Sequence, residues 1–233
     1  MLSLLATLVW LPESLPEERR IRHRLRDMAA GYRFLLRNRR YCAHALALGA
    51  VAGINFSYIS GAPQLFIELH GVSPQQFGIL FGLNAFGLIG ASQLNRRLLR
   101  RYPSELLMGI AFGINLMSAL LLALAIASGL GGFPAQLVLL FICLCTTGLL
   151  YPNVTALALA PFGSMAGSAS ALLGTIQYTL GATAGACVGM FHNGTGLPMA
   201  LTMAGCAVAG TVAAVVARKP QPLLRECGAE ASP

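Results

Sequence analysis

The distribution of charged residues constrains this sequence more than any other feature. Residues 106–217 form a stretch of 112 residues without a single Asp, Glu, Lys or Arg, and two shorter charge-free stretches precede it at 41–67 and 69–95. Only 10% of the 233 residues are charged, whereas soluble domains carry about 25%. A soluble protein with so few charges would expose large apolar patches and aggregate. The sequence therefore predicts a protein whose main solvent is lipid.

The charge-free stretches divide into segments long enough to cross a membrane, for which a helix needs about 20 mostly apolar residues. The first two stretches provide one segment each. Clusters of Gly and Pro at 128–134, 160–167 and 193–198 break the long stretch into four more. The six predicted spans are residues 42–67, 75–94, 106–127, 135–159, 168–192 and 197–217.

The predicted fold class is an all-α integral membrane protein, with a six-helix transmembrane bundle at residues 41–217. Residues 1–11 are apolar but about half the length of a span, and we interpret them as the tail end of a preceding membrane helix. Residues 12–40 are expected to form a basic cytoplasmic connector, which is either simply solvated or held close to anionic lipid headgroups. Residues 218–233 are expected to form a cytoplasmic tail.

The basic residues predict the orientation of these spans. All 16 Lys and Arg residues fall into three groups, at 19–40, 96–101 and 218–225. In a six-span topology the three groups lie on one side of the membrane, and positively charged loops are typical of the cytoplasmic side. Both termini are therefore expected in the cytoplasm. The net charge of +8 is explained by this topology, and a nucleic-acid partner is not expected.

The sequence offers little for catalysis or metal binding. The four histidines are scattered, and no acidic residue lies deep inside a predicted span. Glu68 and Glu105 fall at span ends, where an interfacial position explains them. We therefore expect neither an enzyme nor a bound metal or cofactor.

Uncharged polar residues are the more informative feature of the spans. Facing lipid would be costly for them, so they are expected to face neighbouring helices or a wet cavity. Each one taken alone is explained by hydrogen bonding between helices. As a set spread over several spans, they also fit the lining of a polar path. The candidate substrate-binding residues that line this cavity are Asn55, Tyr58, Asn84, Asn153 and Gln177.

Glycines and prolines add two expectations about how the helices are arranged. Glycines spaced by four residues along the fifth span allow close approach of another helix. Pro63 and Pro152 lie toward the ends of the first and fourth spans, which are equivalent positions if the six spans form a 3+3 inverted repeat, as in secondary transporters. The candidate helix-packing residues are Gly174, Gly181, Gly185 and Gly189.

Several motifs along the chain occur together in one known family. They are LPESLP at 11–16, YISGAP at 58–63, SPQQFG at 73–78 with FGLN at 81–84, PN at 152–153 with ALAP at 158–161, and AGSASALLG at 166–174 followed by Gln177. In this order they resemble the C-terminal half of Bcr/CflA-type multidrug efflux transporters, a group within the major facilitator superfamily. The first motif is similar to the exit from the sixth helix, and the last to the eleventh helix.

This resemblance implies a proton-driven exporter of small amphipathic compounds, such as bicyclomycin or chloramphenicol, in a bacterial inner membrane. The family has twelve spans, so six helices would form one wall of a central cavity. They would rock against a second bundle, which is either a separately encoded N-terminal half or another copy of this chain. The family's proton-linked acidic residue is expected in the other half. The alternative is a truncated product that inserts into the membrane and exports nothing.

Overall fold

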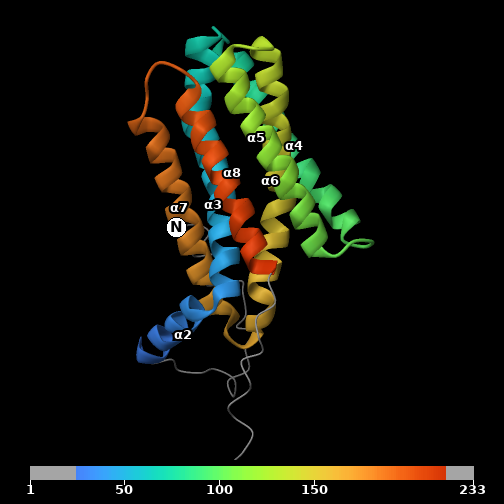
Figure 1. The fold of residues 1–233 in the computed structure, drawn as a ribbon, viewed down its shortest axis with the longest axis vertical. Helices are drawn as coiled ribbons and strands as arrows, with labels where there is room; N and C mark the ends of the chain where they lie inside the picture. The colour runs from blue at the N-terminus through green and yellow to red at the C-terminus, as the bar shows by residue number, and fades with distance from the viewer. Residues whose placement is uncertain (1–24, 219–233) are drawn as a thin grey trace, which may run out of the picture.

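The computed structural model describes residues 25–218, and this part of the chain is almost entirely helical (Figure 1). The interpretations of residues 1–11 and of the tail beyond Arg218 lie outside the described residues. A short helix, α2, precedes the six long helices, and two of the long helices continue into a short helical extension. The elements are α2 (Leu25–Arg37), α3 (Arg39–Pro63), η2 (Gln64–Leu69), α4 (Pro74–Leu98), α5 (Ser104–Ser128), α6 (Gly132–Leu159), η3 (Ala160–Met165), α7 (Ala166–Met190) and α8 (Leu197–Arg218).

Six of these helices are long and apolar enough to cross a membrane, which confirms the predicted all-α six-helix bundle. Their ends differ from the predicted ends by a few residues because local caps set them. Asn38 starts α3 by accepting a hydrogen bond from the backbone nitrogen of Tyr41 at 3.0 Å. Ser73 and Gln76 form a reciprocal capping box at the start of α4. Gly129 and Gly131 take positive φ values of 70° and 75° in the turn between α5 and α6, a conformation that favours glycine.

The helix α3 lies at the centre of the bundle and packs against α6, α7 and α8 (Figure 1). The helices α4 and α5 both pack on α6, and α5 also packs on α8. In contrast, α7 and α8 have few contacts with each other, although both contact α3 extensively. Burial follows this arrangement. In the most apolar segment of each helix, 72% of the residues are buried in α3 with η2, but only 28% in α7 and 6% in α4.

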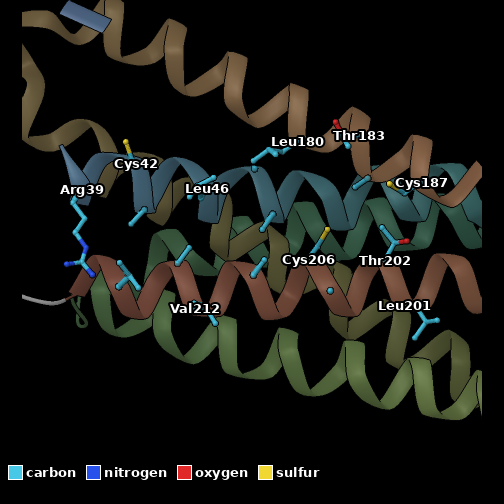
Figure 2. Close-up of a pocket in the computed structure, with 18 of the residues that line it drawn as sticks. Arg39, Cys42, Leu46, Leu180, Thr183, Cys187, Leu201, Thr202, Cys206 and Val212 are labelled. Atoms are coloured by element: carbon cyan, nitrogen blue, oxygen red, sulfur yellow. The ribbon is translucent and has the colours of Figure 1, made fainter. Parts of the chain in front are cut away.

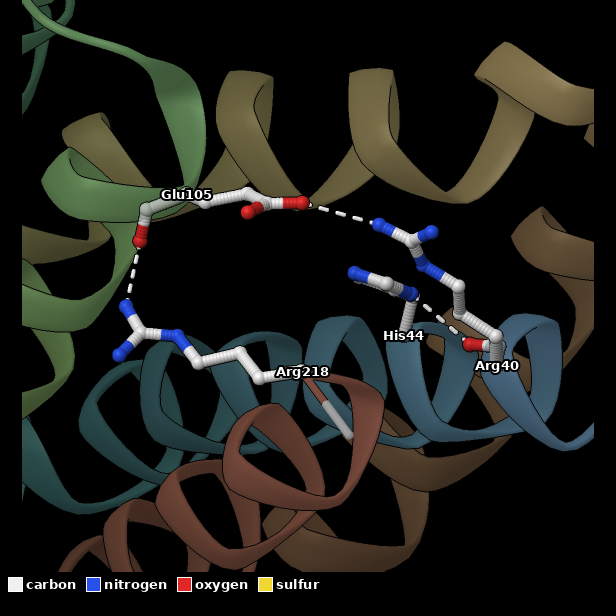
Figure 3. A network of polar contacts seen from close by, with 4 residues as sticks. All are labelled: Arg40, His44, Glu105 and Arg218. Atoms are coloured by element: carbon white, nitrogen blue, oxygen red, sulfur yellow. Dashed lines mark hydrogen bonds and ion pairs between the residues drawn. The ribbon is translucent and has the colours of Figure 1, made fainter. Parts of the chain in front are cut away.

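One end of the bundle carries the arginines of the described residues, and we call it the basic end. It contains the start of α3, the turn between α4 and α5, and the end of α8. Glu105, in the first turn of α5, links these helices (Figure 3): its carboxylate accepts a hydrogen bond from the Arg40 guanidinium at 2.9 Å, and its backbone oxygen accepts one from Arg218. Glu105 therefore lies at the end of a long apolar helix, where the sequence places it, and its interfacial position stays a prediction.

The six helices form two triplets, α3–α4–α5 and α6–α7–α8, that begin at opposite ends of the bundle (Figure 1). The first helix of each triplet contains a proline, Pro63 at the end of α3 and Pro152 inside α6. Each of these helices also continues into six residues that are not α-helical: η2 is a π-helix and η3 a 3₁₀ helix. This arrangement fits the expected 3+3 repeat.

Candidate functional site

Two of the candidate residues, Tyr58 on α3 and Asn84 on α4, meet inside the bundle. The Asn84 amide donates a hydrogen bond to the Tyr58 hydroxyl at 3.0 Å. Both residues are buried, with 4% and 5% of their surfaces exposed. The Tyr58 ring also stacks on Phe81, with ring centroids 5.3 Å apart. The pair therefore joins α4 to the central helix.

Asn153, on α6, is buried and belongs to a second pair. Its amide donates to the side-chain oxygen of Asn95 on α4 at 2.7 Å and to the backbone oxygen of Leu149 at 2.8 Å. The Asn153 side-chain oxygen is buried without a hydrogen-bond partner. An unmet buried acceptor is costly in a low-dielectric interior, so this oxygen lowers the net stabilisation that the Asn95–Asn153 contact provides.

The other two candidates, Asn55 and Gln177, lie closer to the surface of the bundle. Asn55 is half-buried and donates a hydrogen bond to the Val51 backbone oxygen at 3.1 Å, within its own helix. Gln177 is half-buried at the middle of α7 and makes no side-chain hydrogen bond to another described residue. In this conformation the structure does not bring the five candidates into one cluster: it forms two interhelical pairs and leaves two separate amides near the surface.

The helices α3 and α7 expose further polar side chains where they pack together. Tyr178 is 62% exposed at the centre of α7, and its ring makes an edge-to-face contact with Phe56 of α3 at 6.4 Å. Ser60 of α3 and Thr175 of α7 are also exposed. We call these three exposed side chains, together with the half-buried Asn55 and Gln177, the exposed polar set.

The predicted packing glycines divide into two pairs. A side chain at Gly181 would meet Phe56 at 3.0 Å and Ala52 at 3.2 Å, and one at Gly185 would meet the Ser60 hydroxyl at 3.0 Å. These two positions therefore allow α7 to approach α3 closely. Gly174 and Gly189 face open space, with no atom within 4 Å of an added Cβ.

Sequence reasoning missed a second stripe of small residues, on α3 itself. Gly49, Gly53, Ser57 and Gly61 repeat every four residues, and the three glycines lie against Leu180 of α7, Cys206 of α8 and Met199 of α8 respectively. The repeat is visible in the sequence and could have been found by the spacing rule used for α7. Because these residues are small, α7 and α8 can pack closely against α3.

A further buried amide, Asn115 on α5, was not among the candidate residues predicted from the sequence. The Asn115 side chain donates to the Thr146 hydroxyl at 2.8 Å and to the Cys143 backbone oxygen at 2.9 Å. This amide joins α5 to α6. Together these three contacts between helices tie α4 and α5 to the rest of the bundle.

Comparisons with known proteins agree with this architecture. Residues 1–186 match the Major Facilitator Superfamily. The chain belongs to this superfamily. It is 34% identical over 203 residues to an uncharacterized MFS-type transporter, YdgK, of Bacillus subtilis, a match that covers 87% of this chain and 50% of the relative.

A second relative is a bicyclomycin resistance protein homolog of Haemophilus influenzae, 30% identical over 203 residues, which cover 87% of this chain and 51% of the relative. The chain thus spans about half the length of the curated relatives it matches. It is a multi-pass membrane protein of a transporter superfamily, and its six helices fit half of the superfamily fold.

Proposed function

We propose that this chain is one half of a drug/proton antiport-type transporter, and that it contributes one wall of a central cavity for small amphipathic compounds. Bicyclomycin is the substrate we would test first, because one relative is described as a bicyclomycin resistance protein homolog. Chloramphenicol is the second, because the resemblance of the sequence motifs implies it. The six helices would correspond to the C-terminal half of a Bcr/CflA-type transporter in a bacterial inner membrane. Both ends of the described chain would then face the cytoplasm.

The observation that carries this proposal is the exposed polar set, above all Gln177 and Tyr178 at the centre of α7. A polar side chain at mid-membrane is costly when it faces lipid and is expected to face protein or a wet cavity. Within the six helices, the exposed face of α7 is covered neither by protein nor by an enclosed cavity. A second bundle placed against α7 would enclose these groups and create a polar cavity between the halves.

The least covered helix, α4, supports the same arrangement. Phe86 and Ile79 are 74% and 70% exposed. Because the Tyr58–Asn84 and Asn95–Asn153 pairs hold α4 in place, its outer face is presented as a fixed surface. We propose that α4 and α7 contact the second bundle, which is either a separately encoded half or another copy of this chain.

The five candidate residues would then have two roles. Asn55 and Gln177 would contact the substrate, because both are only half-buried. Tyr58, Asn84 and Asn153 would hold together the helices that shape the cavity. Rocking of one bundle against another as a rigid body would leave these contacts within the bundle intact.

Drug accumulation in bacteria that lack other exporters tests this proposal. The chain would be expressed alone and together with the part of the Haemophilus influenzae relative that it does not match. We expect reduced accumulation of bicyclomycin or chloramphenicol when both parts are present, and loss of this effect in Gln177→Ala. A matched control is Gln75→Ala, an exposed amide in the first turn of α4 that lies outside the exposed polar set.

The transport proposal would be contradicted if the protein inserts well but drug accumulation stays unchanged. This result would have to hold for the chain alone, for the chain with the second part, and at high expression. That result would favour the alternative, a truncated product that inserts and exports nothing. Export by the chain expressed alone would instead favour a second copy as the partner bundle.

A further inference from the structure

A long groove separates α7 from α8 on the surface of the bundle (Figure 2). Its volume is about 1180 Å³. Leu180, Thr183 and Cys187 line it from α7, and Leu201, Thr202 and Val212 line it from α8. The groove exists because both helices pack on α3 and have few contacts with each other.

The floor of the groove is made of small residues. Near the basic end it is α3 itself, at Gly49 and Ala50. Farther along, Ala184 of α7 and Cys206 of α8 both lie over Gly53 of α3. These two side chains then form the floor in place of α3. Because small side chains keep the floor low, the groove stays open along its length.

The groove is long enough to hold an acyl chain. It follows α8 from Val216 to Leu201, a rise of about 22 Å at about 1.5 Å per residue. One leaflet of the hydrocarbon core is about 15 Å thick, half of the full core. A lipid chain that enters at the basic end could therefore lie in the groove over the full depth of its leaflet.

The two ends of the groove differ in charge. The lining is mostly apolar, but Arg37 and Arg39 lie at the basic end. In Figure 2 the Arg39 side chain extends from α3 toward the last turns of α8 and crosses this end of the groove. Phe34 and Leu36 of the adjoining α2 are 58% and 55% exposed, as expected for a helix that lies at the level of the lipid headgroups.

This groove is separate from the exposed polar set. Leu46 lines the groove on α3, and Asn55 lies nine residues farther along, which is about 180° around an α-helix. Asn55 and the groove therefore lie on opposite sides of the central helix, and no residue of the exposed polar set lines the groove. An occupant of the groove would not contact Asn55.

We propose that the groove between α7 and α8 binds an anionic phospholipid, with its phosphate at Arg37 and Arg39 and one acyl chain along α8. Apolar surface alone would accept any lipid, but two arginines at the headgroup level select a negative headgroup. Basic pockets between membrane helices are known to bind anionic lipids in this way. The proposal does not depend on transport, because the site lies within the six helices themselves.

Lipid titration of the purified full chain tests the site. Delipidated protein in detergent is titrated with phosphatidylglycerol and with phosphatidylcholine, and bound lipid is counted by native mass spectrometry. We expect one tight phosphatidylglycerol and no comparable site for phosphatidylcholine. Arg39→Gln should weaken the site about fivefold and the double variant Arg37→Gln/Arg39→Gln roughly 25-fold, at the strength typical of one arginine near a membrane surface.

Filling the groove provides an independent variant. Ala209 is exposed on α8 and lines the groove, so Ala209→Phe should remove tight binding without disturbing the core. The neighbouring Val208 is 44% exposed and is not part of the lining, which makes Val208→Phe a matched control. Arg100→Gln is the control for charge, because Arg100 is exposed at the same end of the bundle and away from the groove.

Four results would overturn the proposal. Equal binding of the two lipids would show a nonselective annular contact, and equal losses in the controls would show a general charge or surface effect. Displacement of phosphatidylglycerol by bicyclomycin or chloramphenicol would show a drug site. Dimers that disappear in Ala209→Phe but not in Val208→Phe would show that a second copy covers the groove.

Discussion

Tyr58, Asn84, Asn95 and Asn153 show how single residues hold this bundle together. Lipid tails are as apolar as leucine side chains, so burial of apolar surface contributes little to helix association in a membrane. Close packing and hydrogen bonds between helices take its place. The two pairs join α4, the least buried helix, to α3 and α6. Single polar atoms are therefore expected to have measurable effects on stability.

Tyr58→Phe tests how much the hydrogen bond between Asn84 and the Tyr58 hydroxyl contributes to stability. The variant keeps the ring and its stacking on Phe81 but removes the acceptor for the Asn84 amide. We expect the free energy of unfolding to fall by about 1 kcal/mol, the usual size of a hydrogen bond between membrane helices. The measurement is reversible unfolding of the purified protein in mixed micelles of a mild detergent and a denaturing detergent.

Tyr178→Phe is the matched control, because the Tyr178 hydroxyl lies on a side chain that is 62% exposed. Its unfolding free energy should stay within error of the unsubstituted chain. Equal losses in the two variants would mean that the Tyr58–Asn84 bond contributes nothing specific.

At the scale of helices, the central position of α3 depends on its glycines. Gly49, Gly53 and Gly61 lie against α7 and α8, while Gly181 and Gly185 of α7 lie against α3. These contacts bring helix backbones close enough for extensive packing. They also set the distance between α7 and α8, and so the width of the groove between them.

Gly53→Ala tests this packing. The added methyl group would lie 2.6 Å from the Cys206 sulfur and 3.2 Å from the Ala184 methyl group, so the Cys206 side chain or the helices α7 and α8 would have to move. Overpacking of this kind usually destabilises by about 1–3 kcal/mol, and we expect a loss in that range in the same unfolding assay. Adding Cys206→Ala should recover part of it, because the closest atom is then removed.

Gly113→Ala on α5 is the control, since an added Cβ there has no atom within 4 Å. A similar loss at Gly113, or no recovery with Cys206→Ala, would contradict the steric explanation.

At the scale of the whole molecule, charge assigns the two ends of the bundle. The arginines of the described residues gather at the basic end, where Glu105 links α3, α5 and α8. The Arg40–Glu105 pair is exposed at both side chains, 44% and 55%, so its own contribution to stability is expected to be small. The gathered charge matters more for orientation, because positive loops are retained in the cytoplasm.

Thiol labelling of intact bacteria tests the orientation. In a variant whose six native cysteines are replaced by alanine, a cysteine at Ser128 or Thr195 should react with a membrane-impermeant reagent from outside the cell. A cysteine at Arg100 should react only after the cells are opened. The reverse pattern would contradict cytoplasmic termini, and labelling of all three positions in intact cells would show mixed insertion.

The sequence by itself determined the number of spans, their approximate ends and the gathering of the basic residues at one end of the bundle. These properties act on linear segments: a run of apolar residues enters lipid as a helix, and positive charge between two runs resists translocation. The sequence motifs also indicated the superfamily, and the comparisons confirm that membership. The roles proposed for the five candidate residues remain predictions.

Only the tertiary structure decided which polar and small residues meet. Asn153 is 58 residues from Asn95, and Tyr58 is 26 residues from Asn84, and composition cannot show how far each helix is rotated about its axis. The same rotation places Gly181 and Gly185 in contacts while Gly174 and Gly189 face open space. Close fit between side chains fixes that rotation, and the fit depends on all the helices at once.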